Sequence, residues 1–133
     1  MSTMVEFLRK KLNMEFDEAV ARVTKIVAEE GFSVMLVKAI NEIFRKKLNV
    51  EYPKYTTILA CGAKFAKAAL DVSKNVGMLF PCSFTVHENK GEVFVSHISI
   101  MKIASVIGLV PADAMKPVIE MTGKAVHRAW DRL

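Results

Sequence analysis

Two cysteines are the residues of this sequence with the widest range of possible chemistry. Cys61 ends a predicted strand just before a predicted helix, so backbone N–H groups at the helix start could stabilise its thiolate. Cys82 directly follows Pro81. A thiolate acts as a nucleophile, as a redox partner or as a ligand for a soft metal ion. The alternative is that each cysteine serves as a small buried hydrophobic residue, because unpaired cysteine is among the most buried residue types.

The spacing of the two cysteines does not match a CxxC redox or zinc motif. If the two strands were joined by a right-handed parallel crossover, Cys61 and Cys82 would lie at opposite ends of the sheet, about 20 Å apart. The thiols could meet only if the segment Asn75 to Pro81 carried the chain back along the sheet. The sequence therefore predicts two thiols that act separately.

The three histidines, His87, His97 and His127, do not suggest a metal site. His87 and His97 belong to a predicted hairpin and are expected near opposite ends of one of its faces. His127 is expected on the solvent side of the last helix. A metal site would need ligands from different faces of the sheet, and the phosphate, dinucleotide and metalloprotease motifs are absent. The sequence predicts neither a metal nor a cofactor.

A β-hairpin is the best-defined local structure of the sequence. Its strands are predicted over Cys82 to Glu88 and Glu92 to Ile98, joined by the turn residues Asn89-Lys90-Gly91. Folding the hairpin about Lys90 predicts that its core face carries Cys82, Phe84, Val86, Phe94 and Ile98. The other face is predicted to carry Ser83, Thr85, His87, Val93, Val95 and His97, and this mixed composition suits an interface or the neighbourhood of a site.

Strands and helices are interspersed along the rest of the chain. The first helix could start at Asn13 or at Glu15, and it ends at Gly31, which suits a left-handed cap. We expect an α+β domain spanning residues 1–133, with an antiparallel or mixed β-sheet and helices packed mainly on one face. The remaining expected elements are strands over residues 3–11, Phe32 to Val37 and Tyr55 to Cys61, and helices over Ile40 to Leu48, Ala63 to Val72, Ile100 to Gly108 and about 113–132.

Composition narrows the function further. The chain has 133 residues and a formal net charge of +5, and its cations are dispersed rather than gathered beside aromatic residues. A nucleic-acid partner is therefore not expected. Charged residues near the N-terminus leave no signal-peptide core, and the most apolar stretch, Ile98 to Val110, is too short to span a membrane. These features predict a soluble cytoplasmic protein without a membrane partner.

Three stretches resemble the small bacterial and archaeal family known as domain of unknown function 302. They read FDEAVARVTKIVAEEGF, YTTILACGAKFAKAAL and GMLFPCSFTVHENKGEVFV, and the resemblance covers roughly residues 3–100. It implies a compact α+β domain, often dimeric, without an assigned activity, and some members are encoded beside sulfur-trafficking or redox proteins. The two family cysteines correspond to Cys61 and Cys82. Many members have Asn-Pro after the first cysteine, where this chain has Gly62-Ala63.

Two functions remain open. The first is thiol-dependent sulfur, redox or soft-ligand handling through Cys61, Cys82 or both, with a small sulfur-containing or thiol-reactive ligand. It requires at least one solvent-reachable thiol with a lowered pKa. The second is a non-catalytic homodimeric binding or interaction module. Its interface would be either the hairpin face with Ser83, Thr85, Val93 and Val95 or the segment Ile98 to Val110.

Overall fold

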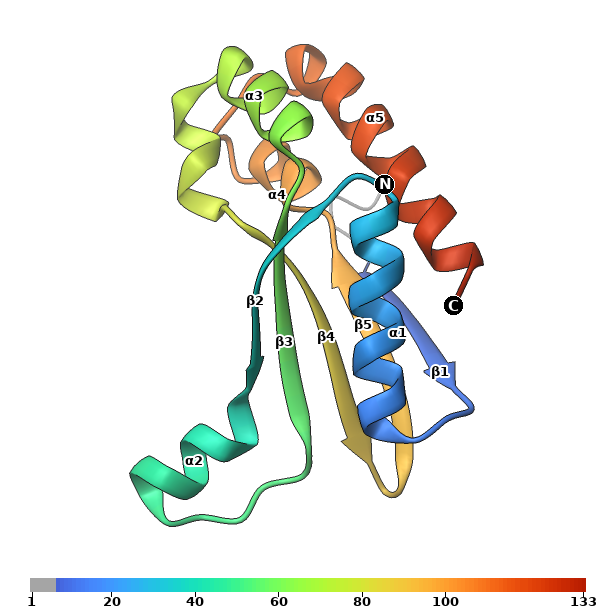
Figure 1. Ribbon diagram of the computed structural model, residues 1–133. Helices are drawn as coiled ribbons and strands as arrows, with labels where there is room; N and C mark the ends of the chain where they lie inside the picture. The colour runs from blue at the N-terminus through green and yellow to red at the C-terminus, as the bar shows by residue number, and fades with distance from the viewer. Residues whose placement is uncertain (1–6) are drawn as a thin grey trace.

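A computed structural model describes residues 7–133. Within them, five strands form one antiparallel sheet in the order β1-β5-β4-β3-β2 (Figure 1). This arrangement confirms the predicted α+β class, and residues 3–6 of the first predicted strand lie outside the described part. The strands are β1 (Phe7–Leu12), β2 (Ser33–Ala39), β3 (Tyr55–Cys61), β4 (Cys82–Asn89) and β5 (Glu92–Ile98).

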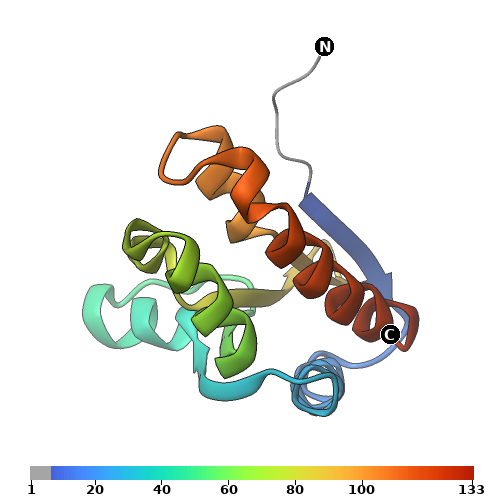
Figure 2. The same ribbon diagram turned by 90° about the horizontal axis from the view of Figure 1, so that it is seen from above.

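The helices occupy three places around this sheet. Seen from above, α1 and the C-terminal part of α5 lie on the same side of the sheet (Figure 2). Helices α3 and α4, the 3₁₀ helix η1 and the first half of α5 gather beyond one end of the strands, and α2 lies at the opposite end (Figure 1). The helices are α1 (Phe16–Glu29), α2 (Ile40–Leu48), α3 (Ala63–Val72), η1 (Lys74–Leu79), α4 (Ile100–Val106) and α5 (Ala112–Asp131).

The apolar core has two parts. The larger part lies between the sheet and the helices α1 and α5, where branched and aromatic side chains of β3, β4 and β5 pack on helix residues such as Ala19, Val23 and Ala125. The smaller part lies beyond the end of the sheet and joins α3, η1, α4 and α5 around Met101 and Met115. Burial of these apolar side chains is the main force that holds the helices in place.

The hairpin has a different register from the predicted one. Asn89 pairs with Glu92, so the turn contains only Lys90 and Gly91, whose φ values of 52° and 80° are both left-handed. Two left-handed residues are the pattern of a tight two-residue hairpin turn. The prediction had centred the hairpin on Lys90, and a one-residue shift turns every side chain of a strand to the other face.

The shift changes the faces assigned to β5. Phe84 pairs with His97 and Val86 pairs with Val95, and all four side chains are buried beneath the helices. Val93 is also buried. The predicted placement of Phe94 and Ile98 on the core face, and of Val93, Val95 and His97 on the outer face, was therefore wrong. The assignment of β4, with Phe84 and Val86 in the core, was correct.

Ion pairs fasten the end of α5 to the end of α1. Arg128 Nε donates to Glu30 Oε1 at 2.9 Å, and Arg132 Nη1 donates to Glu30 Oε2 at 3.1 Å. Arg132 also pairs with Glu29. The hydrogen bonds from Arg128 and Arg132 lower the pKa of Glu30, so its carboxylate stays charged. These contacts help to set the direction in which α5 crosses the sheet.

Two glycines should respond in opposite ways to substitution by alanine. A Cβ at Gly62 would lie 2.4 Å from the Phe65 ring and 3.0 Å from the Gly31 carbonyl oxygen, whereas a Cβ at Gly123 would meet nothing within 4 Å. We expect Gly62→Ala to lower the free energy of unfolding by about 1–3 kcal/mol through overpacking. Gly123→Ala, inside helix α5, should raise it by about 0.5–1 kcal/mol. Urea denaturation of both variants measures the difference, and equal effects would contradict the packing at Gly62.

Candidate functional site

The two cysteines lie at the same end of the sheet. Strand β3 pairs antiparallel with β4, and Cys82 lies directly opposite Ala60, the residue before Cys61. The predicted parallel crossover, with thiols about 20 Å apart, was therefore wrong. After α3, helix η1 and the cis Phe80-Pro81 step carry the chain back to the end where β3 stops. The segment Asn75 to Pro81 thus provides the return path by which the two thiols can lie at one end of the sheet.

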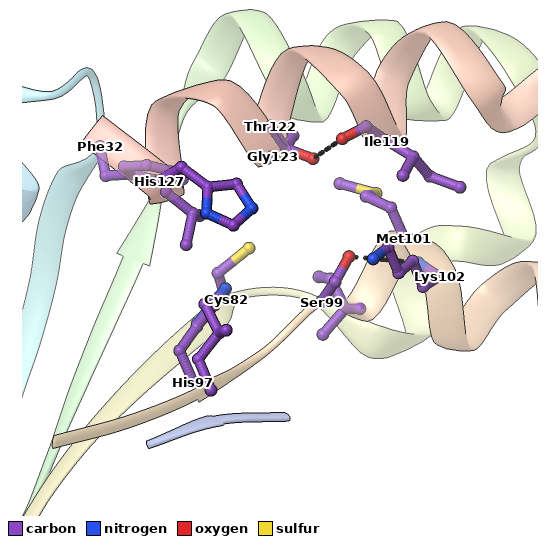
Figure 3. A pocket seen from close by; sticks show the side chains of 13 residues that line it. Phe32, Cys82, His97, Ser99, Met101, Lys102, Ile119, Thr122, Gly123 and His127 are labelled. Carbon is purple, nitrogen blue, oxygen red and sulfur yellow. Dashed lines mark hydrogen bonds between the residues drawn. The ribbon is translucent and has the colours of Figure 1, made fainter. Parts of the chain in front are cut away.

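Cys82 opens into a cavity of about 240 Å³ between the end of the sheet, α4 and α5. In Figure 3 its sulfur points into this space, toward the imidazole ring of His127. The apolar part of the lining comes from Leu8, Phe32, Ile100, Met101, Ile119 and Val126. The remaining lining residues are Cys82, His97, Ser99, Lys102, Thr122, Gly123 and His127.

Burial decides the protonation state of the Cys82 thiol. Desolvation, with a smaller effect from the nearby Cys61, raises the pKa of Cys82 to about 11. A thiolate in apolar surroundings loses its hydration, so the protonated form is favoured. At neutral pH the cavity therefore holds a neutral thiol. For Cys82 this direction is opposite to the lowered pKa that the thiol hypothesis required.

His97 lines the same cavity in a defined orientation. Its Nδ1 lies 2.9 Å from the carbonyl oxygen of Ser83, and because a carbonyl only accepts, we assign the proton to Nδ1. Its ring stacks on Phe84 with centroids 4.2 Å apart. Only 7% of His97 is exposed, and burial lowers its pKa against the opposing effect of the Ser83 bond. His97 is thus a neutral imidazole whose Nε2 keeps its lone pair.

Cys61 borders a second, much smaller space. A cavity of about 10 Å³ is lined by both cysteines together with Phe65, Phe80 and Met101, among others. Because side chains alternate along a strand, Cys61 belongs to the face opposite that of Ala60, whereas Cys82 shares the face of the buried Phe84. Helix α3 starts directly after Gly62, which sits against the Phe65 ring. Cys61 therefore lies close to Cys82 but does not line the larger cavity.

The other predicted site residues lie on the sheet face that carries neither α1 nor α5. Ser83 and Thr85 line a shallow depression there with Phe7 and Arg9, among others. His87 stacks between Tyr55 and Phe94, with ring centroids 5.7 and 5.6 Å away. Its Nδ1 is buried without a hydrogen-bond partner, and burial, followed by the charge of Arg9, lowers the pKa of His87. The structure thus brings Cys82 and His97 together and leaves Ser83, Thr85 and His87 on another surface.

Sequence reasoning missed the cavity residues that the helices contribute. His127 was expected on the solvent side of the last helix and is exposed there, but it also lines the Cys82 cavity. Ser99 and Lys102, which were not considered as site residues, line it as well. One signal was present, because Gly123 and His127 are four residues apart and so share one side of a helix. That spacing does not tell which neighbour the side faces, and this depends on how α5 crosses the sheet.

Within residues 7–133, no three or more histidine, cysteine or carboxylate side chains are grouped so that they could hold a metal ion. Nor is any helix in this part of the chain long and apolar enough to cross a membrane.

Comparison with known proteins agrees with the fold and leaves the chemistry open. The family model described as Domain of unknown function DUF302 matches residues 8–133. The chain belongs to the DUF302 family. A similar solved structure is that of an uncharacterized conserved DUF302 protein from Bacillus stearothermophilus, with a TM-score of 0.84 and 17% identity over 95% of this chain and 96% of that chain. At this identity the likeness shows a shared fold. No functionally curated protein matches the chain.

The pH dependence of alkylation tests the environment of Cys82. With the pKa of Cys82 at about 11, the reactive thiolate is a small fraction at neutral pH and grows as pH rises. In a Cys61→Ser variant, we expect the rate of iodoacetamide labelling to increase about tenfold per pH unit up to about pH 10. Intact-mass spectrometry follows the reaction. A rate that levels off near neutral pH would contradict the buried neutral thiol.

Proposed function

We propose that this DUF302 protein handles a small sulfur-containing or otherwise thiol-reactive ligand through Cys82. The observation that carries the proposal is the position of the Cys82 thiol, which opens into a cavity that His97 and His127 also line. A nucleophile with imidazole groups nearby is a recurring arrangement for thiol chemistry, because the thiol must lose its proton before sulfur attacks.

The burial of Cys82 is compatible with this role. A neutral thiol is protected from unselective oxidation, since susceptibility follows thiolate character and exposure. A ligand inside the cavity would place an electrophilic sulfur or a soft ion next to Cys82 and exclude water at the same time. The proton would then move to an imidazole, and His97 is buried in its neutral form with Nε2 unprotonated. The apolar walls would hold the carbon skeleton of the ligand.

Cys61 contributes through its closeness to Cys82. Its position raises the pKa of Cys82, because two neighbouring thiolates repel each other. We assign the ligand-contacting role to Cys82 and regard Cys61 as the residue that influences its ionisation.

Narrowing the cavity at Gly123 tests this proposal without disturbing either cysteine. Gly123 borders the cavity and has open space at its Cβ position. In a Cys61→Ser background, Gly123→Leu should slow the modification of Cys82 by 4,4′-dithiodipyridine several-fold, because the leucine side chain occupies the access route. The smaller Gly123→Ala serves as the matched control and should slow it less.

Intact-mass spectrometry and urea denaturation complete the experiment. The Gly123→Leu variant should unfold at a urea concentration close to that of Gly123→Ala, which shows that the fold is retained. Cys82→Ser should abolish the adduct. If Cys82 in the folded protein resists the reagent until urea unfolds it, the proposed function is wrong.

A second candidate function is a homodimeric interaction module that uses the sheet face opposite α1 and α5. One observation favours it: this face carries the aromatic stack of Tyr55, His87 and Phe94, and Phe7 at its edge is 55% exposed. Large apolar patches on a surface often mark interaction sites. The correction to the hairpin register changes the residues involved, because Val93 and Val95 are buried and Ser83 and Thr85 remain.

A charged substitution in the middle of that face tests the dimer. Thr85→Arg should convert a dimer into a monomer, since an unpaired arginine would be buried in the interface. Ala21→Arg, on the exposed side of α1, adds the same side chain elsewhere and should leave the dimer intact. Native mass spectrometry measures the subunit number. A monomeric wild-type protein at micromolar concentration, or a dimer that survives Thr85→Arg, would count against this candidate.

A further inference from the structure

The charge around the Cys82 cavity has one sign. Among the described lining residues, Lys102 and His127 have basic side chains, and none is an aspartate or a glutamate. Lys102 comes from α4 and His127 from α5, so the two groups border the cavity from different helices (Figure 3). Both residues are exposed, whereas Met101 beside Lys102 is buried. The basic groups therefore belong to the solvent side of the cavity and the apolar groups to its interior.

Resting on the proposed function of Cys82, we propose that its ligand is a small anionic disulfide, an organic disulfide that bears carboxylates near its sulfur atoms. The disulfide sulfur would meet Cys82, the carbon chain would lie along the apolar wall of Ile100, Ile119 and Val126, and a carboxylate would remain near Lys102. A cavity of about 240 Å³ suits a ligand of this small size. The absence of carboxylates from the described lining means that nothing there repels the negative charge.

The exchange step balances without any further reagent. The Cys82 thiol gives its proton to Nε2 of the His97 imidazole, and its sulfur attacks one sulfur of the disulfide. A bond forms between Cys82 and that sulfur, the original S–S bond breaks, and the other half leaves as a thiolate that recovers the proton. The ligand disulfide is the oxidant, and Cys82 is oxidised to a mixed disulfide. The positive charge of Lys102 stabilises the negative charge of both the carboxylate and the leaving thiolate.

Three aliphatic disulfides of nearly equal length and different charge test whether the ligand is anionic, separately from whether Cys82 reacts at all. They are 3,3′-dithiodipropionate, which is anionic, bis(2-hydroxyethyl) disulfide, which is neutral, and cystamine, which is cationic. Each is allowed to react with a Cys61→Ser variant, and the rate of mixed-disulfide formation is measured by intact mass. The rate at Cys82 is divided by the rate at which the same reagent modifies N-acetylcysteine at the same pH. This reference rate is first corrected for the thiolate fraction and the charge of N-acetylcysteine. The corrected rate is then independent of the intrinsic reactivity of each reagent.

We expect the anionic reagent to react fastest and the cationic reagent slowest. At low salt the corrected rates of these two should differ by about tenfold, and added salt should shrink the difference. Lys102→Glu should reverse the order, and Lys102→Gln should largely remove it. Lys46→Glu changes the net charge by the same amount on α2, at the opposite end of the sheet (Figure 1), and should keep the wild-type order.

The results test the anionic ligand and the role of Cys82 separately. If all three reagents modify folded Cys82 at the same corrected rate, or if both Lys102 variants retain the wild-type order, the anionic ligand is ruled out and the proposed function stands. If none of the three, nor 4,4′-dithiodipyridine, modifies Cys82 before the protein unfolds, the proposed function itself fails. Circular dichroism of each variant confirms that the comparison is made between folded proteins.

Discussion

The antiparallel pairing of β3 with β4 is the constraint on which the rest of this structure depends. It requires the chain to return along α3 and η1 to the end of the sheet where β3 stops, and it places Cys82 opposite Ala60. The same return brings α3 and η1 together with α4 and the first half of α5 in a second apolar cluster beyond the strands. A parallel crossover would have removed both the neighbouring thiols and the cavity.

The second cluster determines the environment of the thiol. Helices α4 and α5 cover the end of the sheet closely enough to desolvate Cys82 and His97, yet the small residue Gly123 leaves space between them. Desolvation favours the neutral form of each group, so it raises the pKa of the cysteine and lowers that of the histidine. The site is thus uncharged in its interior and basic at its solvent side.

The two faces of the sheet have separate roles. One face is occupied by α1 and α5 and supplies the core, and the other retains an aromatic stack and a shallow depression. The ion pairs of Glu30 with Arg128 and Arg132 join the ends of α1 and α5. Among the described residues His97 lines both the cavity and the depression, so a ligand in the cavity and a second copy on the uncovered face would have this residue in common.

Local patterns were sufficient for most of the elements. Periodicity and turn chemistry predicted the helix that ends before Gly31, the helix that starts at Ile40 and the hairpin strands, because these signals depend on neighbouring residues alone. The hairpin turn shows where this approach stops. Asn89, Lys90 and Gly91 all suit a turn, and only the observed left-handed conformation of the last two defines which residues face each other. A shift of one residue then moved Val93, Val95 and His97 from the predicted surface into the core.

The sequence by itself therefore determined the α+β class, the family and the identity of the two thiols. It could not determine their distance, because the direction of β4 relative to β3 depends on pairing between residues far apart along the chain. It also could not reveal the cavity. Lys102 and His127 appear on helix surfaces like many other polar residues, and they border one space with Cys82 only because α4 and α5 pack beyond the same end of the sheet. The burial of Cys82 and the basic residues around its cavity are consequences of that packing, and tertiary structure alone decided them.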